Sequence, residues 1–206
     1  ENREDPYSRY PKRDADVGID VKYGLTSNLT LNLAMNPDFG QVESDPAFIN
    51  LSAFEVYLPE KRPFFIEGAS LYKFRMAASG GGGDMEGGGS DTGSDTLFYS
   101  RRIGRSPQGY PRNARYADIP ETIPITAALK VSGKTKGGWS LGFLEAVTPS
   151  MDASYIEDFQ GSEKSAQIEP LTSYTVLRVQ KDFRAGRSAL GGIFTMVERN
   201  LDEESS

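Results

Sequence analysis

The 206-residue sequence contains neither cysteine nor histidine. Without cysteine, disulfide frameworks, zinc–thiolate clusters and thiol catalysis are excluded. Without histidine, serine–histidine triads, histidine general bases and most transition-metal sites are excluded as well. No stretch approaches the roughly 20 apolar residues that a membrane-spanning helix needs. A formal net charge of −6 gives no electrostatic footprint for nucleic-acid binding, so we expect no nucleic-acid partner.

Alternating apolar and polar residues are the strongest pattern that is present, and a period of two predicts β-strands. In residues 17–23, for example, Val17, Ile19, Val21 and Tyr23 alternate with polar residues or glycine. The turn-rich composition, with 22 glycines and 12 prolines, fits short connections between such strands. The three predicted hairpins join residues 17–23 to 29–35, 125–132 to 139–148, and 173–183 to 188–198.

We interpret these hairpins as part of an all-β, antiparallel β-barrel of the outer-membrane type, present as a fragment with long loops. A soluble sheet shows the same alternation, but a membrane barrel inverts it, with apolar side chains toward lipid and polar ones toward the lumen. Strands of eight to ten residues suit a tilted crossing of the hydrocarbon core. Aromatic residues near strand ends, such as Tyr23, Trp139, Tyr174 and Phe183, would form interfacial girdles, although aromatics are common in strands generally.

The predicted organisation is a lead-in over residues 1–15 followed by one partial barrel domain over 16–206. Residues 37–124 interrupt it as a long loop or plug-like excursion. Within them, residues 78–95 are almost wholly Gly, Ser, Asp and Thr, which predicts a disordered tip. Because residue 1 follows no signal peptide and no closing strand is evident, we expect an open, curved sheet whose edge strands pair with sequence outside this chain.

The first candidate site is the carboxylate group Asp38, Glu43 and Asp45, close to Asn36. Calcium takes several oxygen ligands, and this loop could supply them, although the spacing matches no EF-hand. The alternative is an acidic, solvated loop in which Asn36 and Asp45 begin turns before prolines. No other cofactor is expected.

The second candidate is the charged segment 59–68, which carries paired aromatics at Phe64 and Phe65. It could be a plug or rim loop folded into a lumen. Two carboxylates could also suggest glycosidase chemistry, but nothing in the sequence fixes their separation. The charged residues concerned are Glu60, Lys61, Arg62 and Glu67.

The third candidate is the arginine group Arg101, Arg102 and Arg105. Such side chains could line a lumen opposite acidic residues, or bind anionic lipopolysaccharide at the rim. The alternative is ordinary charge pairing within the same loop.

Four segments carry a resemblance to a known family. They are VGIDVKYGLTSNLTL (17–31), NPDFGQVESDP (36–46), PEKRPFFIEG (59–68) and FYSRRIG (98–104). They resemble large Gram-negative surface proteins in which a family-9-type carbohydrate-binding domain precedes a barrel-like domain of unknown function. The resemblance covers roughly residues 16–200. This resemblance implies an outer-membrane β-barrel without an assigned activity. Carbohydrate binding is implied only for the upstream domain, not for the barrel-like domain itself.

The expected function is therefore a channel, transport or scaffold role in the cell outer membrane, without enzymatic activity. Expected partners are outer-membrane lipid or lipopolysaccharide, and carbohydrate through the upstream domain. One alternative is a soluble all-β carbohydrate-binding module that stacks Trp139 on sugar rings. Another is a β-rich glycoside hydrolase, against which the missing histidine and nucleophile elbow count.

If the apolar face of the predicted strands meets lipid, substitutions at two neighbouring positions should have different effects on stability. Leu31→Arg should lower the free energy of unfolding by a few kcal/mol if position 31 meets mid-bilayer lipid, while Asn32→Lys should cost little. Denaturant unfolding in lipid vesicles measures both. Equal, small effects would contradict a lipid-facing Leu31.

Overall fold

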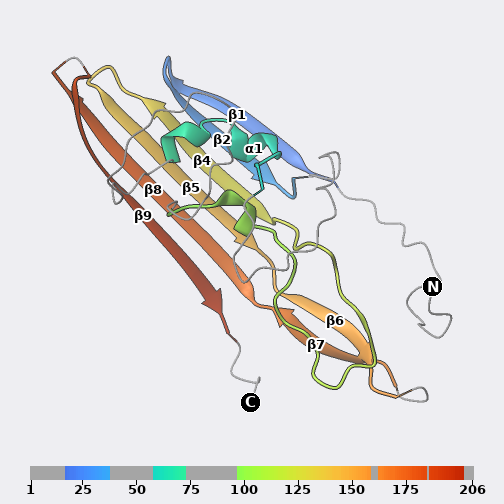
Figure 1. The fold of residues 1–206 in the computed structure, drawn as a ribbon. Helices are drawn as coiled ribbons and strands as arrows, with labels where there is room; N and C mark the ends of the chain where they lie inside the picture. The colour runs from blue at the N-terminus through green and yellow to red at the C-terminus, as the bar shows by residue number, and fades with distance from the viewer. Residues whose placement is uncertain (1–16, 38–57, 73–96, 159–161, 185, 202–206) are drawn as a thin grey trace, which may run out of the picture.

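The computed structural model describes residues 17–37, 58–72, 97–158, 162–184 and 186–201, and these form an all-β fold with very little helix (Figure 1). The larger of two antiparallel sheets has six strands in the order β1-β2-β4-β5-β8-β9. Its strands are β1 (Ile19–Thr26), β2 (Leu29–Met35), β4 (Ala127–Lys134), β5 (Trp139–Thr148), β8 (Leu171–Phe183) and β9 (Ser188–Asn200).

The three hairpins that the alternation predicts are confirmed. They are β1–β2, β4–β5 and β8–β9, and their turns lie together at one end of the sheet, at the upper left in Figure 1. The longer connections, which join β2 to β4 and β5 to β8, leave from the opposite end. The sheet is open: it has β1 and β9 at its edges and does not close into a barrel within the described residues.

A second, three-stranded sheet was not predicted. It has the order β3-β6-β7 and is built from β3 (Tyr116–Asp118), β6 (Met151–Ile156) and β7 (Lys164–Glu169). Gly109 lets the chain pass beside this sheet, since its N–H donates to the Ile168 carbonyl at 3.0 Å and a Cβ there would collide with the Ile168 backbone. These short strands escaped detection because their alternation spans too few residues.

The described residues 58–72 and 97–105, which lie between β2 and β3 in the sequence, pack over one face of the large sheet (Figure 1). They contain α1 (Pro63–Ile66), η2 (Ala69–Tyr72) and η4 (Ser100–Arg102). We call residues 58–72 and 97–105 the inner segment. Residues 97–103 alternate in places like a strand, but the chain turns here through the 3-10 helix η4 and forms no strand. None of the described helices is long and apolar enough to cross a membrane.

The strand register divides the side chains of the large sheet between two faces of opposite character. The inner face, under the inner segment, carries mainly charged, polar and small residues together with Leu144, Tyr174 and Val176, and its residues on the central strands are mostly buried. The outer face carries aliphatic and aromatic residues, which stay partly or fully exposed. Outer-face residues, as paired in the register, include Ile19, Val21, Tyr23, Leu31, Leu33, Leu129, Val131, Leu141, Phe143, Leu177, Val179, Phe194 and Met196.

The expectation that Asn32→Lys costs little is wrong on this geometry. Asn32 is only 6% exposed and lies opposite Lys130 in the β2–β4 register. A lysine at position 32 would bring a second ammonium group beside a buried first one. The better control for Leu31→Arg is Asp20→Lys. Asp20 lies on the inner face, as Asn32 does, but at an exposed position of β1.

Candidate functional site

Lys130 joins the large sheet to the inner segment. Its side chain is 0% exposed, and its amine donates to the carbonyl oxygens of Phe64 and, at 2.6 Å, of Glu67. The amine also lies 4.8 Å from the centroid of the Phe64 ring. A buried ammonium group is very costly unless acceptors surround it, so these carbonyls must stay in place for Lys130 to face inward.

A second network fixes the shape of the inner segment itself. The Arg62 guanidinium donates to both carboxylate oxygens of Glu60, at 2.8 and 2.7 Å, and to the carbonyls of Ser100 and Ile103, at 2.8 and 2.6 Å. The Ser100 hydroxyl also donates to Glu60, at 2.5 Å. Burial would raise the pKa of Glu60, but the hydrogen bonds and charge of Arg62, with the Ser100 hydroxyl, outweigh it and hold this pKa below its ordinary value.

Apolar contacts complete the attachment. Tyr72 donates its hydroxyl to the Phe143 carbonyl at 2.9 Å, and its ring lies so close to β5 that a Cβ at Gly142 would be 3.0 Å from it. Burial raises the pKa of Tyr72, so its hydroxyl stays a donor. Phe65 and Ile103 pack with Tyr72 against inner-face residues of the sheet, so one apolar cluster spans both parts.

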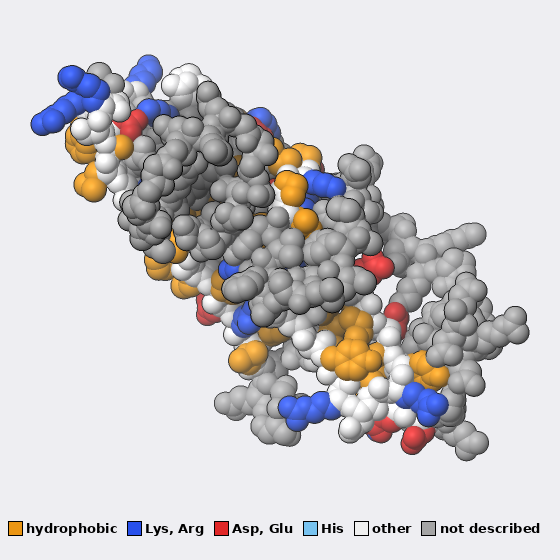
Figure 2. Space-filling model, viewed as in Figure 1, with side chains coloured by type: hydrophobic (Ala, Val, Ile, Leu, Met, Phe, Trp, Pro, Cys, Tyr) orange, Lys and Arg blue, Asp and Glu red, His pale blue; other side chains and the backbone are white. Residues whose placement is uncertain are grey.

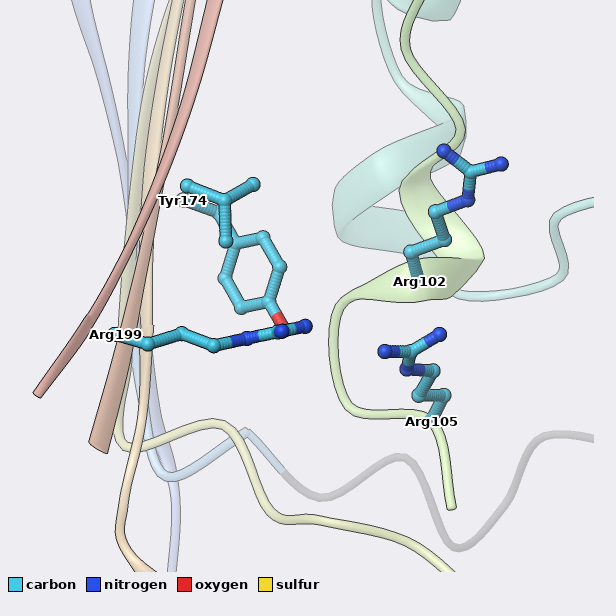
Figure 3. A pocket seen from close by; sticks show the side chains of 5 residues that line it. Arg102, Arg105, Tyr174 and Arg199 are labelled. Atoms are coloured by element: carbon cyan, nitrogen blue, oxygen red, sulfur yellow. The ribbon is translucent and has the colours of Figure 1, made fainter. Parts of the chain in front are cut away.

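An open pocket of about 640 Å³ lies beside this attachment, between the inner segment and the C-terminal strands. Arg102 and Arg105 reach it from the inner segment, while Tyr174 of β8 and Arg199 of β9 reach it from the sheet (Figure 3). Val197 also lines the pocket, and none of the described residues that line it is a carboxylate. Three guanidinium groups therefore face one cavity in a chain whose formal net charge is −6.

The three predicted arginines do not share one site, whereas several charged residues of segment 59–68 contact one another. Arg102 and Arg105 line the pocket, whereas Arg101 donates to the Pro59 carbonyl at 2.6 Å. Glu60 and Arg62 pair with each other, and the backbone N–H of Lys61 donates to Glu60 at 3.1 Å. Glu67 instead forms an ion pair with Lys22 of β1, and the hydrogen bond from Lys22 lowers the pKa of Glu67.

The predicted calcium ligands Asp38, Glu43 and Asp45 lie outside the described residues. Within the ranges that are described, no three acidic side chains gather in a way that could hold a metal ion. Trp139, the candidate for sugar stacking, is 45% exposed, but the amine of Lys181 lies 5.2 Å from the centroid of its ring.

Three important residues were missed by sequence reasoning: Lys130, Tyr72 and Arg199. The prediction that Tyr174 belongs to an interfacial girdle is wrong, because this side chain lies on the inner face of β8 and is only 8% exposed. Lys130 had a usable signal, since it is a charged residue between Leu129 and Val131 in the middle of β4. No sequence signal pointed to Arg199, because its approach to Arg102 and Arg105 depends on where the inner segment lies in the fold.

Comparison with known proteins adds one finding. A family model described as Domain of unknown function (DUF5916) matches residues 4–76 and 92–205. The chain belongs to this family. Membership of a family of unknown function, which the four motifs predicted, is confirmed, while the upstream carbohydrate-binding domain stays a prediction. The matched ranges contain the whole inner segment and pocket. No curated protein and no solved structure matches the chain.

Replacing Lys130 tests whether it holds the inner segment. Lys130→Met leaves the Phe64 and Glu67 carbonyls without their donor, so we expect a loss of about 1–3 kcal/mol in the free energy of unfolding. Hydrogen exchange at residues 63–67 should speed up. The control is Lys134→Met, which removes an exposed ion pair with Asp182 and should cost at most about 1 kcal/mol. Equal losses with unchanged exchange would contradict the assignment.

The lowered pKa of Glu60 predicts that acid weakens the attachment of the inner segment to the sheet. Because its pKa in the folded protein lies below the ordinary value of 4.5, its stabilisation is complete above that pH and is lost as the pH falls through the lowered pKa. In Glu60→Gln the pH dependence of unfolding below pH 4.5 should be flatter than in the parent. Glu121→Gln, at an exposed position, should leave the slope unchanged. A parent slope retained in Glu60→Gln would refute this role.

Proposed function

We propose that this chain forms part of the wall of an outer-membrane β-barrel, with the inner segment folded against the wall as a plug. The observation that carries the proposal is the inverted polarity of the large sheet. Its buried face holds Lys130, Arg178 and Asn32, while Val21, Leu177 and Phe194 of the other face are 47%, 43% and 54% exposed. An outward apolar face opposite a polar interior is the arrangement of membrane barrels.

The two ends of the sheet support this orientation. Short turns at one end and long connections at the other are typical of outer-membrane barrels. A tilted strand needs about 9–11 residues to cross the hydrocarbon core. β5 has 10 residues, and β8 and β9 have 13 each, while β1, β2 and β4 have 7 or 8.

Side chains near the turn end are consistent with a membrane boundary. Tyr23, Trp139 and Phe183 are exposed there, and amphipathic aromatics concentrate at such boundaries. Lysine and arginine side chains gather at the same end of the molecule in Figure 2.

Glu145 is a charged residue on the outer face, and it helps to locate the other boundary. It accepts hydrogen bonds from the hydroxyls of Ser173, at 2.5 Å, and Thr175, at 2.6 Å, both on β8. These residues lie toward the long-connection end of the sheet. A carboxylate satisfied by neighbouring hydroxyls fits the edge of an apolar belt better than its centre.

The plug gives the proposed role. Polar wall residues that would otherwise line an aqueous interior are occupied by the inner segment, so the wall and plug together suit a gated channel or transport component. A scaffold role lacks a comparable reason for burying Lys130. Outer-membrane lipid is the proposed partner of the outer face, and any link to carbohydrate would come through a neighbouring domain.

Vesicle flotation of the full-length protein tests the proposal. The parent should float with phosphatidylcholine vesicles and resist a carbonate wash. Replacing Leu129 and Leu177 together by Arg should abolish flotation, because Arg at the bilayer midplane costs about 2–4 kcal/mol per site. The matched Leu129→Ala and Leu177→Ala pair should still float.

Two outcomes would count against a lipid-facing wall. The first is a parent protein that stays monodisperse in plain buffer, unfolds cooperatively and does not bind vesicles. The second is equal flotation of the arginine and alanine pairs. Either result would favour a soluble protein whose outer face is covered by other protein.

A further inference from the structure

We propose that the pocket lined by Arg102, Arg105, Arg199 and Tyr174 binds the phosphate group of a soluble, phosphorylated solute. The site requires only the inner face and the inner segment. It would therefore stand even if the outer face met protein instead of lipid.

The charges in the pocket match a phosphate dianion. Arg105 and Arg199 both interact electrostatically with Tyr174, and so does one carboxylate, that of Glu169. Glu169, at the end of β7 in the small sheet, is 3% exposed and accepts a hydrogen bond from the backbone N–H of Gln108 at 3.1 Å. Among the described charges around Tyr174, Arg105 and Arg199 therefore outnumber this carboxylate, which leaves a net positive charge opposite in sign to the charge of about −1.5 to −2 on a phosphomonoester.

The two sheet-side groups differ in exposure, which suits a site that a ligand can reach. Tyr174 is buried at 8% exposure, whereas Arg199 is exposed at the edge strand β9. Neither Arg105 nor Arg199 forms an ion pair with any residue in the described ranges. Figure 3 shows Arg199 extending from the sheet toward Arg102 and Arg105, which lie across the cavity. Planar guanidinium groups on two sides can each bond two phosphate oxygens.

The position of the pocket favours a solute over a lipid headgroup. Tyr174 lies opposite Val197, and Arg199 lies opposite Thr172, which is 0% exposed on the inner face. The pocket thus belongs to the face that carries Lys130 and not to the exposed apolar face. A cavity of about 640 Å³ has room for a sugar phosphate as well as for the phosphate group alone.

Calorimetric titration of the full-length protein in detergent, with inorganic phosphate and glucose 6-phosphate as probes, tests this site. Both should bind, and Arg105→Gln or Arg199→Gln should weaken binding about tenfold or more. The control is Arg187→Gln in the β8–β9 turn, which should leave affinity unchanged. Circular dichroism confirms that each variant is folded, and Arg199→Lys should restore only part of the affinity, because lysine keeps the charge without the planar fork.

The pH profile adds a second readout. Since the chain has no histidine, stronger binding between pH 5.5 and 7.5 should follow the second ionisation of the phosphate, with a gain of several-fold. Absence of binding, equal weakening by Arg187→Gln, or a flat pH profile would overturn the proposal. So would binding to vesicles containing phosphatidic acid without binding to either soluble probe, since that would assign the pocket to a lipid headgroup.

Discussion

The rest of the structure depends on the hydrogen bonds that the buried amine of Lys130 donates to the inner segment. This amine is fully buried in the middle of β4, so it requires carbonyl acceptors, and the inner segment supplies them from Phe64 and Glu67. Because strand side chains alternate, an inward Lys130 forces Leu129 and Val131 outward. The antiparallel register then carries the same division across the six strands, which gives the sheet a polar buried face and an apolar exposed one.

The inner segment therefore has two consequences for function. It covers the polar wall, and the network of Arg62, Glu60 and Ser100 gives it a defined shape. That shape places Arg102 and Arg105 opposite Arg199, at the edge of the region the segment covers. If the segment moved away from the wall, the pocket would lose two of its three guanidinium groups. A phosphorylated ligand in the pocket would thus favour the docked state of the plug.

The sequence predicts the sheet well and the candidate site poorly, and both outcomes have physical reasons. Alternation in long strands made all three hairpins predictable, although in the third hairpin apolar residues occur on both faces. The short strands β6 and β7 and the helical turn at 100–102 lack a long repeat to reveal them. The motif at 59–68 marked a charged segment of interest, but its partners, among them Lys130, lie far along the chain. Contacts of that kind are set by tertiary packing and leave no local pattern.

Contact between the outer face and lipid is the central claim, and the absence of cysteine allows it to be measured directly. Single cysteines at Leu129, Leu177 and Asp20 can each carry one bimane label in the full-length protein reconstituted into vesicles. Lipids brominated along their acyl chains should strongly quench labels at positions 129 and 177 and should barely affect the label at position 20, on the inner face of β1. Weak quenching at all three positions, or equal quenching at all three, would contradict a lipid-facing wall.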